Sequence, residues 1–242
     1  MDTFSDHFDG ADLDTKVWLP HYLPHWSSRA ATAARYAIQE SELCLTIAPE
    51  HGLWCPDEHE PMKVSGIQSG VFSGPVGSPV GQQPFSDSVR VKEFQPAHWG
   101  WTPHYGVIEV RARMDISPRS MAAVWMVGLE DAPERCGEIC VVEVFGDAPT
   151  AVGMGLKRLR DPVLTHDFEA PRLPIDVSKF HTYAADWRPG RVEFLVDGEH
   201  VRTVEDAPDY PMQMMVAVFD FPEKGPDTGH VPELAVDYVR AL

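Results

Sequence analysis

The stretch Gly137-Glu138-Ile139-Cys140-Val141-Val142-Glu143-Val144-Phe145-Gly146 places two glutamates and a cysteine in an otherwise apolar, β-branched run. Such a run is typical of a buried β-strand. A buried carboxylate is costly unless it is paired, because its charged form loses hydration. The stretch therefore predicts a strand of the core that carries a functional site, and this site needs both glutamates.

The spacing of the two glutamates sets a condition on this strand. Side chains at positions i, i+2 and i+4 of a regular strand point to one face, so Glu138 and Cys140 share a face. Glu143 follows Glu138 by five residues and would point to the opposite face. A β-bulge inserts one extra residue and can return Glu143 to the first face. We therefore expect a bulge between Cys140 and Glu143.

Strand-like segments of this kind recur along the chain, whereas no segment has a long amphipathic helical pattern. These segments are residues 43–47, 106–114, 121–127, 191–196, 212–218 and 235–240. Asp197-Gly198 between two of them predicts a tight hairpin turn. Residues 48–62 and 69–85 are rich in Pro and Gly and are expected to form loops. The pattern predicts an all-β fold.

Length, charge and cysteine content narrow the function further. The 242 residues fit one large β domain, which we expect to span residues 1–242. The formal net charge of −17 argues against nucleic acid or an anionic membrane surface as a partner. No apolar run is long enough to cross a membrane. The four cysteines are too few for a disulfide scaffold, although one bridge is possible.

The cellular compartment stays open at this stage. Residues 1–6 have neither the basic nor the apolar part of a signal peptide, which fits a cytoplasmic protein or a secreted one whose leader is absent. We expect a monomer.

Glu138-Ile-Cys-Val-Val-Glu143 resembles the Glu-x-Asp-x-x-Glu signature of glycoside hydrolase family 16 in its bulged, laminarinase-like form. Further segments resemble motifs of the same family in the same order, so the likeness covers nearly the whole chain. They are Phe8–Gly10, Tyr105–Arg113, Ala123–Trp125, Phe180–Trp187, Val196–Gly198 and Asp237–Arg240.

The resemblance implies a curved antiparallel β-sandwich of the jelly-roll type, with a cleft on its concave face. It implies endo-hydrolysis of a β-glucan, with β-1,3 or mixed β-1,3/1,4 linkages, and retention of configuration. Carried over by position, Glu138 is the nucleophile and Glu143 the general acid/base. Retaining glycosidases hold these two carboxyl groups about 5–5.5 Å apart. No cofactor is required, and the partner is a polysaccharide or oligosaccharide.

Cys140 departs from the family pattern, which has an aspartate that tunes the nucleophile at this position. A thiol is a weak hydrogen-bond donor, and nearby negative charge raises its pKa. The alternative is therefore a catalytically weak or inactive, lectin-like carbohydrate-binding protein on the same fold.

Aromatic residues are the main candidates for substrate contact, because their faces match the apolar faces of sugar rings. Trp125 corresponds to the tryptophan on which family members stack the substrate. His98, Trp99 and Trp101 lie in a kinked segment and either contact the glycan or pack against the edge of the sandwich.

Metal ligands are expected at one place at most. Asp237 matches an aspartate with which family members hold a structural calcium away from the cleft. His51, Cys55, Asp57 and His59 fall within nine residues, but their spacing matches no zinc pattern, and we interpret them as incidental loop residues. A metalloprotein that uses this cluster is the remaining alternative.

Overall fold

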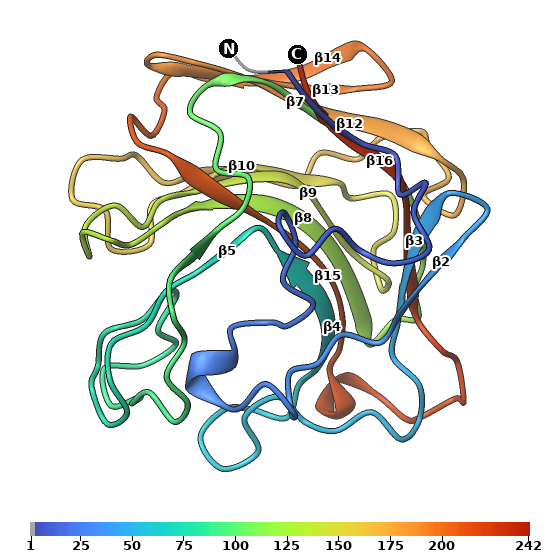
Figure 1. Ribbon diagram of the computed structural model, residues 1–242. Helices are drawn as coiled ribbons and strands as arrows, with labels where there is room; N and C mark the ends of the chain where they lie inside the picture. Colours follow the sequence, from blue (N-terminus) through green and yellow to red (C-terminus); the bar gives the residue numbers. More distant parts are fainter. Residues whose placement is uncertain (1–2) are drawn as a thin grey trace.

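Two antiparallel sheets pack face to face in the computed structural model, which describes residues 3–242 (Figure 1). The larger sheet has the order β14-β13-β12-β7-β16-β3-β2, and β1 pairs with β16 beside it. Its strands are β1 (Phe4–Asp6), β2 (Tyr36–Gln39), β3 (Glu42–Thr46), β7 (Gly106–Asp115), β12 (His181–Arg188), β13 (Arg191–Val196), β14 (Glu199–Val204) and β16 (Glu233–Ala241).

The second sheet has six strands in the order β11-β10-β9-β8-β15-β4 and contains the strand with both glutamates. Its strands are β4 (Lys63–Gln68), β8 (Ser120–Gly128), β9 (Glu138–Phe145), β10 (Gly153–Lys157), β11 (Asp167–Glu169) and β15 (Met212–Asp220). A small pair, β5 (Gly70–Val71) and β6 (His98–Trp99), and two 3₁₀ turns, η1 (Pro24–Trp26) and η2 (Pro222–Lys224), complete the described elements.

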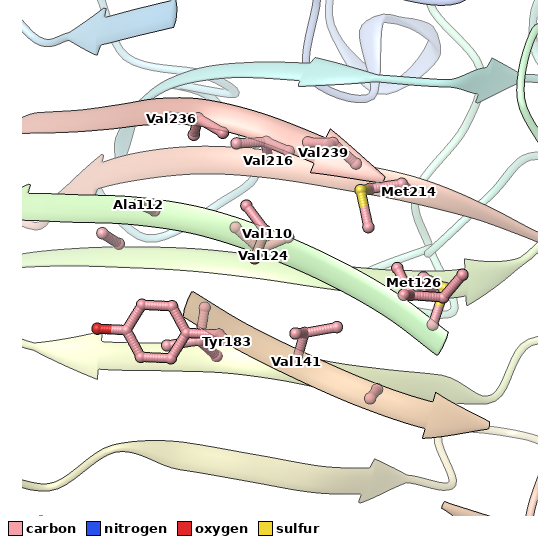
Figure 2. Close-up of a cluster of buried hydrophobic side chains, with 14 of the residues drawn as sticks. Val110, Ala112, Val124, Met126, Val141, Tyr183, Met214, Val216, Val236 and Val239 are labelled. Atoms are coloured by element: carbon pink, nitrogen blue, oxygen red, sulfur yellow. The ribbon is translucent and has the colours of Figure 1, made fainter. Parts of the chain in front are cut away.

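The main core lies between the two sheets, and Figure 2 shows part of it. Alternate residues of β7 point into this core, as the period of two predicts. Valine and methionine side chains dominate it and pack from both sheets. The labelled members are Val110, Ala112, Val124, Met126, Val141, Tyr183, Met214, Val216, Val236 and Val239.

The six-stranded sheet is also covered in part on its other, concave face. Figure 1 shows its long strands curving around the blue-to-green segment that precedes β7. This segment contributes buried side chains such as Leu23, Trp26 and Trp54, which pack against Trp125 and Phe219. All nine residues of β15 are consequently buried. The nearly continuous apolar runs of residues 121–127 and 212–218 therefore belong to strands that are covered on both faces.

The predicted all-β jelly-roll sandwich is confirmed, and the predicted strands lie within a residue or two of those observed. Asp197 and Gly198 have φ angles of 51° and 79° and link β13 to β14, as expected of a two-residue hairpin turn. Residues 69–85 differ in one respect, because Gly70–Val71 forms β5 by pairing with β6. Within residues 3–242 no helix has the length and apolar character needed to cross a membrane.

Candidate active site

A β-bulge in β9 brings the two glutamates to one face of the sheet. Cys140 lies opposite Trp125 of β8, whereas Val142 lies opposite Val124, so Val141 is the extra residue. The pairing with β10 shifts by one residue over the same stretch. Val141 and Val142 both belong to the core between the sheets, although neighbouring residues of a regular strand point to opposite faces. The predicted bulge is confirmed.

Glu138, Cys140 and Glu143 consequently line one pocket on the concave face. Glu138 is almost fully buried, with 6% of its surface exposed, whereas Glu143 is partly exposed. Trp125 lines the same pocket, and its stacking on a substrate stays a prediction.

Lys157 of β10 joins the two carboxylates, and sequence reasoning missed it. Its Nζ atom lies 3.1 Å from Oε1 of Glu138 and 2.8 Å from Oε2 of Glu143. These two contacts limit the separation of the two carboxylate oxygens to about 6 Å. This upper limit is compatible with the spacing of about 5–5.5 Å between the carboxyl groups of retaining glycosidases.

The position of Lys157 follows from the register of the sheet. Lys157 lies directly opposite Glu138 in the β9–β10 pair, and such neighbours place their side chains side by side on one face. The ammonium group also lies 4.7 Å from the centre of the Phe168 ring, which favours a cation. In the sequence, Lys157 differs from its neighbours only as the charged residue that ends the apolar run of residues 153–156.

Burial and charge act against each other in this site. Burial raises the pKa of Glu138, the ammonium of Lys157 lowers it, and the neighbouring Glu143 raises it again, with a net increase. Burial alone would lower the pKa of Lys157, but the carboxylates of Glu138 and Glu143 raise it above its ordinary value. Lys157 is therefore a permanent cation between the carboxylates.

Cys140 contributes a neutral thiol. Its side chain is fully buried between Trp125 and Gly155, its neighbours on the adjacent strands. Burial raises the pKa of this thiol well above its ordinary value, and the two glutamates raise it further against the opposing effect of Lys157. The charged groups that line the pocket are thus two carboxylates and one ammonium.

Aromatic rings form one wall of the pocket. Trp125 and Phe219 lie 6.2 Å apart between ring centres, and Phe219 stacks on Phe221 at the same distance and an angle of 6°. Phe145 continues this row beside Phe221. A row of ring faces next to two carboxylates suits a chain of pyranose rings, whose apolar faces stack on aromatic side chains.

The structure does not bring His98, Trp99 or Trp101 to the glutamates. His98 and Trp99 belong to β6, where Trp99 packs over Gly70. Trp101 stacks on Phe4, with ring centres 4.2 Å apart, and lines a separate pocket next to the C-terminus. A contact of these three residues with substrate stays a prediction.

The residues that the sequence suggested as metal ligands contact other protein groups in the structure. The Asp237 carboxylate is bonded to the guanidinium of Arg111, so this donor set does not fit a calcium ion as it stands. His51 and Cys55 contact backbone oxygens of Val64 and Trp26. Among residues 3–242, no three His, Cys, Asp or Glu side chains are grouped for metal binding.

Comparisons with known proteins bear on the family and the fold of the chain. The model of the family "Glycosyl hydrolases family 16" matches residues 101–239. An endo-β-galactosidase from Clostridium perfringens that releases GlcNAcα1-4Gal has 26% identity and a TM-score of 0.84 over 98% of this chain, which spans 61% of that enzyme's chain. No curated protein sequence matches the chain.

Two laminarinase structures show the same fold at lower identity. The laminarinase from a Flavobacterium species has 20% identity and a TM-score of 0.69, with 98% of each chain covered. The catalytic domain of an endo-1,3-β-glucanase from Thermotoga petrophila has 18% identity and a TM-score of 0.68, with 98% of this chain and 95% of that chain covered.

The burial of the thiols predicts that Cys140 is chemically inert. All four cysteines are free and buried, and burial raises the pKa of each thiol. We expect Ellman's reagent at pH 8 to modify none of them rapidly in the folded protein and all four after unfolding. A rapidly reacting thiol in the folded protein that disappears in the Cys140→Ser variant would contradict the assignment of Cys140 as a buried, neutral group.

Proposed function

The chain belongs to glycosyl hydrolases family 16, and on this basis we propose that it cleaves internal β-glycosidic bonds of a glycan with retention of configuration. The observation that carries the proposal is the pair of Glu138 and Glu143, which Lys157 holds within about 6 Å of each other. At this spacing one carboxylate can attack the anomeric carbon of a glycosidic bond while the other group, in its protonated form, gives a proton to the leaving oxygen.

The surroundings of the two glutamates support separate roles. Glu138 is buried, which raises its pKa, and its pairing with Lys157 opposes this rise and favours the ionised form that attacks the anomeric carbon. Glu143 is more exposed and can reach the leaving oxygen. In the first step Glu143 gives its proton to the oxygen of the leaving sugar, and the glycosidic bond breaks. At the same time Glu138 forms an ester with the anomeric carbon of the sugar that stays bound. In the second step Glu143 takes a proton from water, and the resulting nucleophile breaks the ester.

Lys157 supplies the positive charge that this scheme requires. Ionised Glu138 is buried beside the neutral thiol of Cys140, and the ammonium is its charged partner in the pocket. When Glu143 carries its proton, Glu138 is the one anionic partner left to Lys157. The thiol at position 140 is therefore compatible with catalysis, because the ammonium stabilises the nucleophile directly.

A galactose-containing glycan is the favoured substrate. The support comes from the endo-β-galactosidase, whose identity of 26% and TM-score of 0.84 exceed those of both laminarinases described above. A β-glucan is the second candidate, which the motifs of the sequence favoured. The aromatic wall accepts either, because glucose and galactose both present an apolar ring face.

Substitution of the nucleophile tests the reaction. We expect the wild-type protein to release oligosaccharides from a galactan or another β-galactoside polymer, in an assay panel that includes laminarin and lichenan. Glu138→Gln should lower the rate by at least about 10³-fold, because the nucleophile is lost. The first product should be the β-anomer by proton NMR. Glu40→Gln, in the exposed β2–β3 turn, is the matched control and should keep full activity.

Three results of this panel would change the proposal. Hydrolysis of laminarin or lichenan alone would assign the second substrate class. Binding of a glycan without any hydrolysis would indicate the lectin-like alternative. An unchanged rate in Glu138→Gln would refute the assignment of the nucleophile.

Removal of the ammonium should shift the pH dependence of hydrolysis. Lys157 lowers the pKa of Glu138, so Lys157→Met lets burial raise that pKa further. Since Glu138 must be ionised to attack, the acidic limb of the kcat/KM profile should move to higher pH. The rate on that limb should fall about tenfold for each unit of the shift. Lys157→Arg keeps the charge and should hold the limb near its wild-type position. An unmoved limb in Lys157→Met would contradict the role given to Lys157.

A further inference from the structure

Gln83 lines the same pocket as Glu138 and Glu143. It comes from the long loop between β5 and β6, and its side-chain oxygen Oε1 is buried without a hydrogen-bond partner. The Nε1 atom of Trp125, in the same pocket, is also buried without a partner. Buried polar atoms in folded proteins are nearly always hydrogen-bonded, so an acceptor and a donor left open in one pocket indicate a polar ligand.

The backbone of Gln83 is held in an unusual conformation. Its φ angle of 46° falls in the left-handed region, which residues other than Gly, Asn and Asp rarely adopt. Its N–H donates to Oε1 of Glu130 over 2.6 Å. Glu130 has a φ angle of 55° and is 5% exposed, and its second oxygen is bonded to the guanidinium of Arg160. The ion pair of Glu130 and Arg160 thus fixes the backbone of Gln83.

Gln82 secures the same loop through a different set of contacts. Its side chain accepts a hydrogen bond from the N–H of Phe72 and donates one to the oxygen of Leu129. Its backbone oxygen accepts a hydrogen bond from Nε1 of Trp26. The side chain of Gln82 therefore serves the loop, whereas the side-chain oxygen of Gln83, which lines the pocket, has no hydrogen-bond partner.

We propose that Gln83 is a specificity-determining residue that hydrogen-bonds a hydroxyl group of the bound sugar, and that Glu130 and Arg160 position it. The identity of the ligand as a glycan rests on the proposed function. The amide and the indole N–H are neutral groups, which suits the hydroxyls of a neutral hexose. The hydrogen bond to Glu130 uses the backbone of Gln83, so the loop itself does not require the glutamine side chain.

A glycine substitution removes this side chain without straining the fold. Glycine adopts the left-handed region readily, so Gln83→Gly retains the backbone and its N–H. Glu40→Gly is the matched control, because Glu40 has a φ angle of 54° in an exposed turn far from the pocket. Both variants should keep the wild-type melting temperature or exceed it.

Binding is measured in the Glu138→Gln protein, so that hydrolysis does not interfere. Calorimetric titrations use laminaritetraose and β-1,4-galactotetraose as probes. We expect Gln83→Gly to weaken binding of at least one probe by about three- to tenfold, the range of one neutral hydrogen bond. Glu40→Gly should leave the affinity unchanged. The inference is overturned if the affinity for both probes is the same with and without Gln83, or if neither probe binds.

The positioning pair is tested by coupling to Gln83. Glu130→Gln removes the charge that Arg160 contacts, so it should weaken binding in the protein that retains Gln83. It should have little additional effect in Gln83→Gly, because it acts through that side chain. Equal losses in the two backgrounds would show a merely structural role for Glu130. If the wild-type protein hydrolyses no glycan but binding still depends on Gln83, the proposed hydrolysis fails and the inference about Gln83 stands.

Discussion

One extra residue in a buried strand determines the arrangement of the site. Without the bulge at Val141, the side chain of Glu143 would point between the sheets, into a core of valine and methionine side chains. An ionised carboxylate there would have no partner, at a cost of several kcal/mol in an apolar setting. With the bulge, Val141 and Val142 both fill the core and Glu143 joins Glu138 and Cys140 on the concave face. The packing of the sandwich and the pairing of the carboxylates are therefore satisfied by the same irregularity.

Charge balance is the second constraint on this face of the sheet. Two carboxylates within about 6 Å repel each other, and burial of Glu138 increases the cost of its charge. The ammonium of Lys157 offsets both effects, and the ring of Phe168 lies where it favours that cation. Cys140 adds volume between the two glutamates without adding charge. Cys140 has a thiol where a third carboxylate would add negative charge, and Lys157 on the neighbouring strand adds one positive charge. The net charge of the pocket is therefore close to zero when Glu143 is protonated.

The structural features that the sequence predicted are those that follow from the local spacing of residues. The period of two of a β-strand was enough to derive the strand, the bulge and the shared face of Glu138 and Glu143, and the flanking motifs indicated the sandwich. Lys157 was missed because its contact with Glu138 depends on the register between β9 and β10, which no local pattern specifies. Gln83 was missed for a similar reason, since the hydrogen bond that Gln82 donates to Leu129 and the one that Glu130 accepts from the N–H of Gln83 set the path of its loop. The cluster of His98, Trp99 and Trp101 was visible in the sequence, but the stacking of Trp101 on Phe4 could not be read from it.

The central claim is that Glu138 forms a covalent bond with the sugar during the reaction. A 2-deoxy-2-fluoro-β-galactoside with an activated leaving group slows hydrolysis of such an ester and allows it to accumulate. Mass spectrometry of the digested protein should then find one fluorosugar on the peptide that contains residues 138–143, attached at Glu138. Attachment at Glu143, or continued hydrolysis of a natural glycan with an α-anomer as the first product, would contradict the account.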